Sequence, residues 1–318
     1  MSVFAQQSTS QFALDVAEGL SLRGQKKLAP RYFYDDLGSS LFEAITLLPE
    51  YGLTRADERL LRLHSGEIAR SVRNVSTVSE LGSGSGKKTS HIVRSLQSNG
   101  RSVAYRPIDV SSLALSACER ELGSFCQVMP VCNDWLDGLD EISRERTGSA
   151  SMLLLFLGSS IGNLDRMEIP DFLRELRARL RPDDYLLLGA DLVKDRETMI
   201  AAYDDPTGVT AAFNLNVLGR INRELSADFD LRSFRHEIRW NETERRIEMH
   251  LASLRNQTVT ISALDARISF TAGETIWTES SHKFTEQELD DFALWAGFQP
   301  VASWNDREWP FLEALWRV

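Results

Sequence analysis

Between about residues 58 and 195, short apolar runs alternate with segments of helical periodicity, and this alternation constrains the fold more than any other feature of the chain. Such an order is typical of βαβ units around a parallel sheet. We therefore expect a Rossmann-like α/β fold. Asp165 is placed to cap the helix expected near 165–180. The expected strands are Val75–Leu81, Val103–Val110, Ser151–Leu157 and Tyr185–Ala190, and the expected helices are near 87–98, 112–123 and 165–180.

The pattern changes after residue 195. A helical portion over about 196–225 is followed by segments in which polar and apolar residues alternate, as in antiparallel strands. This predicts an inserted α+β subdomain with strands near 230–240, 245–255, 258–263 and 265–271, and then a helix over 285–297 and two short C-terminal runs. The predicted domains are 58–195 plus 286–318 for the sheet, and 10–57 plus 196–285 for the insert.

Composition excludes several classes of protein. With 36 basic and 46 acidic residues the net charge is −10, so we expect no nucleic acid and no anionic membrane as partner. The sequence contains no uninterrupted run of about 18 apolar residues, so we expect no membrane-spanning helix. Three cysteines without metal-site spacing favour a reducing cytoplasm, and five histidines without an HExxH pattern argue against a bound metal.

The strongest chemical signal is a glycine-rich turn, ELGSGSGKKT, which follows an apolar strand and opens a helix. Glycines at this place permit a tight turn and close approach of the backbone to a ligand. The spacing is GxGxG rather than the dinucleotide GxGxxG, and Glu80 stands two residues before Gly82. This variant suits S-adenosylmethionine, whose amino-acid tail carries no phosphate, better than a dinucleotide. A generic turn is the alternative.

Two later strand ends strengthen that interpretation. Asp109 ends the next expected strand, where a carboxylate can accept hydrogen bonds from both ribose hydroxyls. Asp134 and Trp135 follow one strand later, where they can bind an adenine amino group and stack on its ring. Alone, Asp109 would more often cap a helix, and Asp134-Trp135 would more often form a turn with a half-buried indole.

The fourth expected strand runs into the loop GSSIGNL, which ends near Asn163. Ligands in open α/β sheets lie beyond the carboxyl ends of the strands, and this loop belongs there. The Asn163 amide offers a donor and an acceptor, so it can hold an amine and a carboxylate together. A role in capping a helix is an equally good local interpretation.

Together, these motifs resemble one known family. The chain from about residue 27 to 290 is similar to the histidine-specific Nα-methyltransferases of ergothioneine biosynthesis, whereas the last 25 residues match less clearly. The segments that carry the resemblance are RYFYD, LPEY, ELGSGSGKKT, FLGSSIGNL, LGADLVK, AYDDPTGVTAAFN and WTESSHKF.

The resemblance implies a cytoplasmic enzyme with an S-adenosylmethionine-dependent methyltransferase sheet, which trimethylates the α-amino group of L-histidine to hercynine. It places cofactor contacts at Gly82, Lys88, Asp109, Asp134 and Trp135, although the family pattern leads us to expect Phe at the last position. Asn163 and Tyr203 would hold the carboxylate, and Asn163 with Tyr34 would surround the amine and serve as the catalytic pair. Contacts to the substrate side chain would come from Tyr51, Met249, Glu279 and Ser281.

The chemistry fits this assignment, because methyl transfer from a sulfonium requires mainly orientation and a neutral amine. No residue is an obvious general base. Without the resemblance, each of these tyrosines would be read as an ordinary core or surface aromatic. The nearest alternative is the same fold methylating another amine such as tryptophan, for which an apolar residue would suit position 279 better than Glu279. A nicotinamide-dependent oxidoreductase and a cofactor-sensing module are weaker alternatives. We expect a monomer with a small-molecule substrate.

Overall fold

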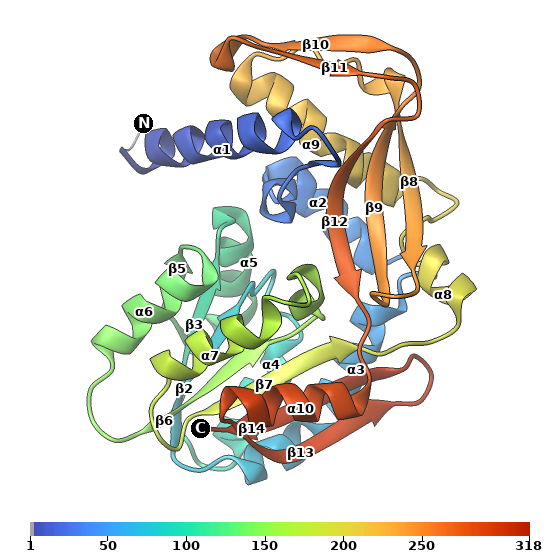
Figure 1. Cartoon of the computed structure of the whole chain (residues 1–318). Coiled ribbons are helices and arrows are strands. Elements are labelled where there is room, and N and C mark those ends of the chain that lie inside the picture. Colours follow the sequence, from blue (N-terminus) through green and yellow to red (C-terminus); the bar gives the residue numbers. More distant parts are fainter. Residues whose placement is uncertain (1–2) are drawn as a thin grey trace. The chain divides into compact units, whose positions relative to one another are not determined.

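The chain folds into two compact units in a computed structural model that describes residues 3–318, with side chains from Gln11 onward (Figure 1). The first unit contains the residues up to Tyr51 together with Asp195–Ser281. The second unit contains Gly52–Lys194 together with His282–Val318. The chain therefore passes from one unit to the other three times.

The second unit contains an eight-stranded sheet whose main path has the order β13-β14-β7-β6-β2-β3-β4, with β5 also paired to β3. Strands β2, β3, β6 and β7 are parallel, and β14 is antiparallel to both β7 and β13. From β2 the chain continues to β3 on one side and later to β6 on the other, which creates a switch point where ligands bind in such sheets. The strands are β2 (Val75–Leu81), β3 (Ala104–Asp109), β4 (Gln127–Val128), β5 (Val131–Cys132), β6 (Ser151–Phe156), β7 (Tyr185–Asp191), β13 (Gln299–Asp306) and β14 (Phe311–Arg317).

Helices cover both faces of this sheet, which confirms the predicted α/β fold (Figure 1). Along β6, Leu153 and Leu155 pack in a core with residues of α3, α4 and α5, while Leu154 and Phe156 pack in a second core with residues of α6, α7 and α10. A strand that is buried on both faces is apolar throughout. The helical segments are α3 (Gly52–Ser71), α4 (Thr89–Ser98), α5 (Ser112–Leu122), α6 (Trp135–Glu145), η2 (Ser160–Asn163), α7 (Ile169–Arg179) and α10 (Glu286–Ala296).

The predicted start of the third helix is wrong. Helix α7 begins at Ile169, four residues after Asp165, and its N-cap Glu168 makes no side-chain cap bond. The Asp165 carboxylate instead accepts from the Met167 amide at 3.2 Å. Pro170 lies in the first turn of the helix, where its missing N–H costs nothing, and this favours the later start.

The first unit combines helices with a four-stranded sheet of order β1-β12-β9-β8 and a two-stranded hairpin, β10-β11. The N-terminal segment is part of this unit: Lys26 and Lys27 form β1 beside β12, and Asp35 accepts a hydrogen bond from Asn216 at 2.7 Å. The helical segments are α1 (Val3–Ser21), η1 (Pro30–Phe33), α2 (Asp36–Thr46), α8 (Arg196–Ala201), α9 (Val209–Leu225), η3 (Leu231–Ser233) and η4 (Ser262–Leu264). The strands are β1 (Lys26–Lys27), β8 (Phe234–Asn241), β9 (Arg246–Ser253), β10 (Gln257–Ile261), β11 (Ala266–Phe270) and β12 (Thr275–His282).

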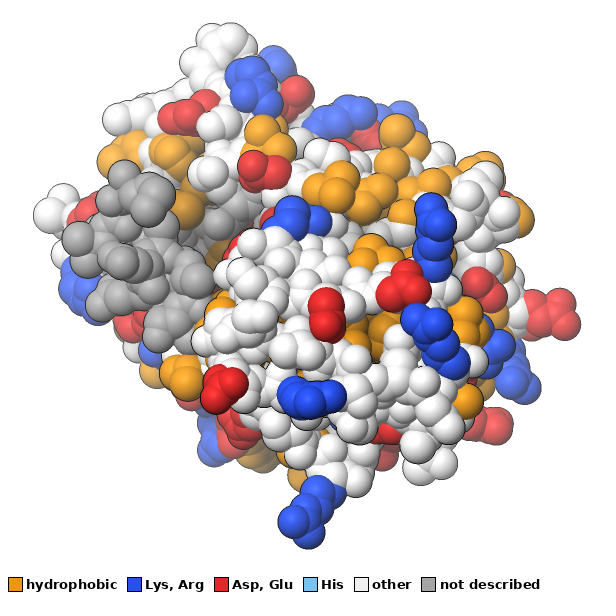
Figure 2. All heavy atoms as spheres, turned by 90° about the horizontal axis from the view of Figure 1, so that it is seen from above, with side chains coloured by type: hydrophobic (Ala, Val, Ile, Leu, Met, Phe, Trp, Pro, Cys, Tyr) orange, Lys and Arg blue, Asp and Glu red, His pale blue; other side chains and the backbone are white. Residues whose placement is uncertain are grey.

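Positive and negative side chains are interspersed on the face shown in Figure 2, where the visible described residues form no continuous basic area. This distribution agrees with the net charge of −10. Within the part of the chain that the structure describes, no helix has the length and apolar character needed to cross a membrane.

Candidate active site

The glycine-rich turn leaves β2 at the switch point of the second unit. Gly82, Gly84 and Gly86 have φ values of 66°, 52° and 70°, in the left-handed region that glycine adopts without strain. The Gly82 amide donates to the Ile108 carbonyl at 2.8 Å, which ties the turn to the end of β3. A Cβ at Gly84 would meet no atom within 4 Å, so the backbone here is open to a ligand.

Asp109, the predicted ribose acceptor, is bonded directly to this turn. Its Oδ2 accepts from the Gly84 amide at 3.1 Å, and its Oδ1 accepts from the Ser111 amide at 2.9 Å. Burial raises the pKa of Asp109, although these backbone donors oppose the shift. The structure therefore brings together two signals that lie 25 residues apart in the sequence.

Trp135 lies against the same turn. A Cβ built on Gly82 would be 3.3 Å from the indole Nε1, so the ring covers this glycine. Trp135 packs edge-on against Phe156 at 4.9 Å between ring centroids. Asp134 is the N-cap of α6, and its carboxylate accepts from the Asp137 amide at 3.1 Å. Asp134 thus caps α6, and its contact with the cofactor stays a prediction.

Lys88, a predicted cofactor contact, is ion-paired with Asp57, whose side chain is fully buried. The Asp57 Oδ2 also accepts from the Gly158 amide at 2.9 Å, at the end of β6. Burial lowers the pKa of Lys88, but the carboxylates of Asp57, Glu80 and Glu313 together raise it above its usual value, so the amine stays charged. Sequence reasoning missed Asp57, although an acid on the apolar face of an amphipathic helix, between Leu53 and Leu60, was a usable signal.

Two further acids lie buried in this part of the second unit. Glu313 on β14 is fully buried opposite Gly189 of β7, and burial together with the nearby Asp57 raises its pKa well above the usual value. Burial likewise raises the pKa of Glu80 to about 7, while its carboxylate accepts hydrogen bonds from Thr89 and Tyr105. Glu80 therefore links the start of α4, directly after the glycine-rich turn, to β3.

Glu80 makes stability depend on pH in a defined direction. Between about pH 4.5 and about 7, native Glu80 retains a proton that the unfolded chain releases, so the free energy of unfolding falls as pH rises through this range. Each unit of pKa difference is worth about 1.4 kcal/mol. We expect Glu80→Gln, which keeps an acceptor oxygen, to flatten this slope in urea unfolding at pH 5, 6 and 7. A slope equal to that of the wild type would contradict the shift.

In the first unit, the structure brings the three predicted tyrosines together. Tyr34 packs edge-on against Phe42 at 5.7 Å, Phe42 against Tyr51 at 6.3 Å, and Tyr51 against Tyr203 at 5.9 Å between ring centroids. The Tyr203 hydroxyl is 2.7 Å from Ser281 Oγ, to which it donates. Tyr203 and Ser281, predicted to contact opposite ends of the substrate, are thus bonded to each other.

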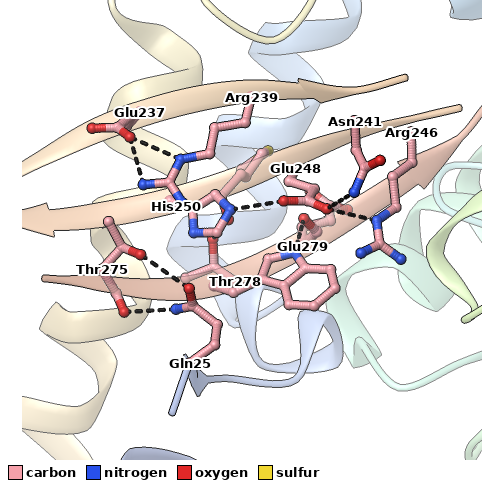
Figure 3. Close-up of polar contacts among 12 residues, drawn as sticks. Gln25, Glu237, Arg239, Asn241, Arg246, Glu248, His250, Thr275, Thr278 and Glu279 are labelled. Carbon is pink, nitrogen blue, oxygen red and sulfur yellow. Dashed lines mark hydrogen bonds and ion pairs between the residues drawn. The ribbon is translucent and has the colours of Figure 1, made fainter. Parts of the chain in front are cut away.

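Glu279 and Met249 lie on neighbouring strands, β12 and β9. The Thr278 hydroxyl donates to the Met249 carbonyl at 3.0 Å, and the Trp277 indole donates to the Glu279 carbonyl at 2.9 Å (Figure 3). Glu279 and Met249 are both buried. Burial along β12 does not follow strict alternation, because Thr278 and Glu279 are buried in succession. A solvated strand end, the ordinary expectation for Glu279, is therefore not what the structure shows.

Asn163 ends η2 in the second unit, after β6. A Cβ at the preceding Gly162 would lie 2.9 Å from the carbonyl oxygen of His282, so this loop packs against the last residue of β12, which belongs to the second unit. The predicted site residues thus fall into two groups, one in each unit. The second unit holds Gly82, Lys88, Asp109, Asp134, Trp135 and Asn163, and the first holds Tyr34, Tyr51, Tyr203, Met249, Glu279 and Ser281.

No group of three or more His, Cys, Asp or Glu side chains is arranged to hold a metal ion among the residues that the structure describes. The residues at the glycine-rich turn fit S-adenosylmethionine, because Gly84 faces open space, Asp109 at the end of β3 accepts from its amide, and Trp135 at the start of α6 covers the neighbouring Gly82.

Comparison with known proteins identifies the family to which the chain belongs. A family model described as "Histidine-specific methyltransferase, SAM-dependent" matches residues 12–318. A Histidine N-alpha-methyltransferase of Mycobacterium tuberculosis is 44% identical and one of Mycolicibacterium smegmatis 41%, and the matches cover 93% and 92% of this chain and 92% and 90% of those proteins. Ergothioneine biosynthesis protein 1 of Neurospora crassa is 28% identical over 89% of this chain and 32% of its own length. This chain therefore belongs to the family of histidine-specific, S-adenosylmethionine-dependent methyltransferases.

Proposed function

We propose that this enzyme transfers three methyl groups in succession from S-adenosylmethionine to the α-amino group of L-histidine, which gives hercynine in the first step of ergothioneine biosynthesis. Membership of the family and the names of its mycobacterial relatives support this proposal. The observation that carries the choice of substrate is the buried group in the first unit, where Glu279 and Ser281 lie on one strand and Ser281 is bonded to Tyr203.

Gly82, Lys88, Asp109, Asp134 and Trp135 would hold S-adenosylmethionine. This co-substrate supplies a methyl group bound to a positively charged sulfur. An amine can attack the methyl carbon and displace the sulfur as a neutral thioether, without a metal. Asp109 would accept from the ribose hydroxyls, and Trp135 would stack on the adenine. The ion pair with Asp57 keeps Lys88 charged, as a role beside the carboxylate of the amino-acid tail requires.

Tyr34 and Asn163 would surround the amine, and Asn163 with Tyr203 would hold the carboxylate. The amine must be neutral to react, so a proton has to leave before each transfer, and we assign its exit to water near Tyr34. Aromatic faces accommodate a quaternary ammonium without donating hydrogen bonds, which suits the trimethylated product. Tyr34 belongs to such an aromatic cluster, since it packs against both Phe42 and Phe213.

The imidazole would be read by polar groups at the other end of the substrate. A neutral imidazole offers one N–H donor and one acceptor nitrogen. Glu279 would accept from the N–H and Ser281 would bond the other nitrogen, with Tyr51 and Met249 lining the ring. Binding would exchange the Tyr203–Ser281 hydrogen bond for bonds to the substrate. Apolar amino acids would leave these buried groups unpaired and would be rejected.

We further propose a cytoplasmic monomer that requires no metal and binds neither nucleic acid nor membrane. Three free cysteines and an acidic, mixed-charge surface support this assignment. Light scattering on the purified protein is expected to give the mass of one chain, 35.9 kDa. A mass of twice this value would overturn the monomer.

The decisive experiment is a competition among substrates. Purified protein is incubated with S-adenosylmethionine and an equimolar mixture of the common amino acids, and the products are analysed by mass spectrometry. We expect histidine alone to gain one, two and finally three methyl groups. Methylation of tryptophan or another amine would preserve the reaction class and overturn the roles of Glu279 and Ser281. The absence of any methylated product would overturn the proposed activity on amino acids.

A further inference from the structure

In the second unit, one small group of residues connects the three places where the chain passes to the first unit. On the side of this unit, those points are Gly52, Lys194 and His282. Asp191 lies at the end of β7, and Trp309 lies between β13 and β14. Between them, these two residues contact the segments at all three points. These segments are distant in sequence, so only the tertiary fold brings them together.

Asp191 binds the second and third of these segments through its carboxylate. Its Oδ1 accepts from Lys194 Nζ at 2.6 Å and its Oδ2 pairs with Lys283 Nζ at 2.8 Å. Backbone bonds reinforce the ion pairs, because the Phe284 amide donates to the Asp191 carbonyl at 3.0 Å and the Val193 amide donates to the Phe284 carbonyl at 3.0 Å.

Trp309 connects the first segment to the same carboxylate. Its indole Nε1 donates to Asp191 Oδ1 at 2.8 Å, and its ring centroid is 4.8 Å from Lys194 Nζ. A Cβ added to Gly52 would lie only 2.0 Å from Cε3 of the indole, so the six-membered ring rests directly on the backbone of Gly52. Glycine at position 52 is required for this contact.

The ion pairs of Asp191 are unusually deeply buried. The exposed fractions of the Asp191, Lys194 and Lys283 side chains are 1%, 4% and 0%. Burying two ammonium groups on one carboxylate costs free energy, so such an arrangement is poor evidence for a simple stabilising role. Burial also lowers the pKa of Lys194 to about 8. A role in fixing geometry explains why this arrangement lies at the three crossings.

We infer that Asp191 and Trp309 are positioning residues, which fix the three crossings and thereby hold Tyr51 and Ser281 in place for the substrate. Tyr51 directly precedes Gly52, and Ser281 directly precedes His282. The substrate part of this inference rests on the proposed function, which assigns Tyr51 and Ser281 to histidine. The anchor itself rests only on contacts within the second unit.

The first test compares Trp309→Phe with Trp304→Phe. Phenylalanine at 309 removes the Nε1 donor and part of the ring over Gly52. Trp304 of β13 is a matched control, because its Nε1 also donates to a carboxylate, Glu67 Oε2 at 2.7 Å, away from the crossings. In ligand-free protein, Trp309→Phe is expected to speed amide hydrogen exchange around residues 50–54, 192–196 and 280–284 together, while Trp304→Phe leaves these segments unchanged. Acceleration confined to residues near 309, or none, would overturn the anchor.

Ligand binding to the same variants separates positioning from general damage. We expect Trp309→Phe, and likewise Asp191→Asn, to weaken histidine binding in calorimetry by about tenfold or more, as misplaced contact groups do. Affinity for S-adenosylhomocysteine should change by less than about twofold, because the side chains of Asp191 and Trp309 bond Lys194, Lys283 and each other rather than the residues predicted to bind the cofactor. Equal loss of both affinities would overturn the positioning role. If the wild type itself binds no histidine, the proposed function fails, and the exchange result still decides the anchor.

A double-mutant cycle tests the contact directly. In the wild-type background, the methyl group of Gly52→Ala must displace the indole, so we expect faster exchange at the three crossings and weaker histidine binding. In a Trp309→Ala background the space is vacant, and the same substitution should add little. Equal effects of Gly52→Ala in both backgrounds would overturn the contact on which the inference depends.

Discussion

Replacing Glu279 by alanine is expected to weaken L-histidine binding by about 1.5–3 kcal/mol, the usual worth of a hydrogen bond to a charged group. Glu279 is buried on β12, and the proposed function gives it the imidazole N–H. Its removal also leaves a larger space without a carboxylate, so the preference for histidine over tryptophan should fall in competition assays. Binding of S-adenosylhomocysteine, measured by calorimetry, should stay close to that of the wild type.

Two further variants sharpen this test. Glu279→Gln keeps an acceptor oxygen without the charge, so its histidine affinity should lie between those of the wild type and Glu279→Ala. Glu237→Ala removes an acid of β8 that pairs with Arg235 and, as Figure 3 shows, with Arg239. It is expected to leave histidine affinity unchanged. Unchanged histidine affinity in Glu279→Ala would remove Glu279 from the substrate site.

Loss of the Asp109 carboxylate is expected to weaken S-adenosylhomocysteine binding by about 1–3 kcal/mol, the cost of leaving polar groups unpaired. Asp109 accepts from the Gly84 amide, so Asp109→Ala also loosens the glycine-rich turn. Asp109→Asn retains one acceptor oxygen and should lose less. Isothermal calorimetry gives the affinities, and thermal unfolding reports any loss of stability.

Asp165→Ala provides the control for Asp109. Asp165 also accepts a backbone N–H in a loop of the second unit, from Met167, but it has no predicted cofactor contact. It should leave affinity for S-adenosylhomocysteine unchanged. If Asp109→Ala binds this ligand as tightly as the wild type does, the ribose has been assigned to the wrong strand end.

Local chemistry made most of the fold readable in the sequence. After Ser151, the run to Leu157 is apolar because β6 is buried on both faces, and alternation after residue 230 predicts the strands β8 to β11. Helix ends were less readable. The sequence predicts that Asp165 caps helix α7, but the helix begins four residues later. Pro170 lies in its first turn, where the missing N–H of proline costs nothing, and this favours the later start.

The glycine-rich turn and the position of Asp109 at the end of a strand are also predictable from the sequence, since backbone freedom and the end of a strand are local properties. The contacts of Asp57, Asp191 and Trp309 are not predictable in this way. The Asp57 contact with Gly158 spans 101 residues, and the Trp309 contact with Asp191 spans 118. Sequence spacing carries no information on contacts of such length, and a lone Asp or Trp has many more ordinary roles.

The sequence by itself determined the parallel sheet and the glycine-rich turn, and it supplied the side chains that we propose to bind an amine, a carboxylate and an imidazole. Only the tertiary structure decided that Tyr34, Tyr51 and Tyr203 form one aromatic cluster, that Tyr203 bonds Ser281, and that Glu279 is buried rather than solvated. The physical reason is that burial and long-range pairing are set by how several elements pack, whereas periodicity and turn chemistry act between neighbours along the chain.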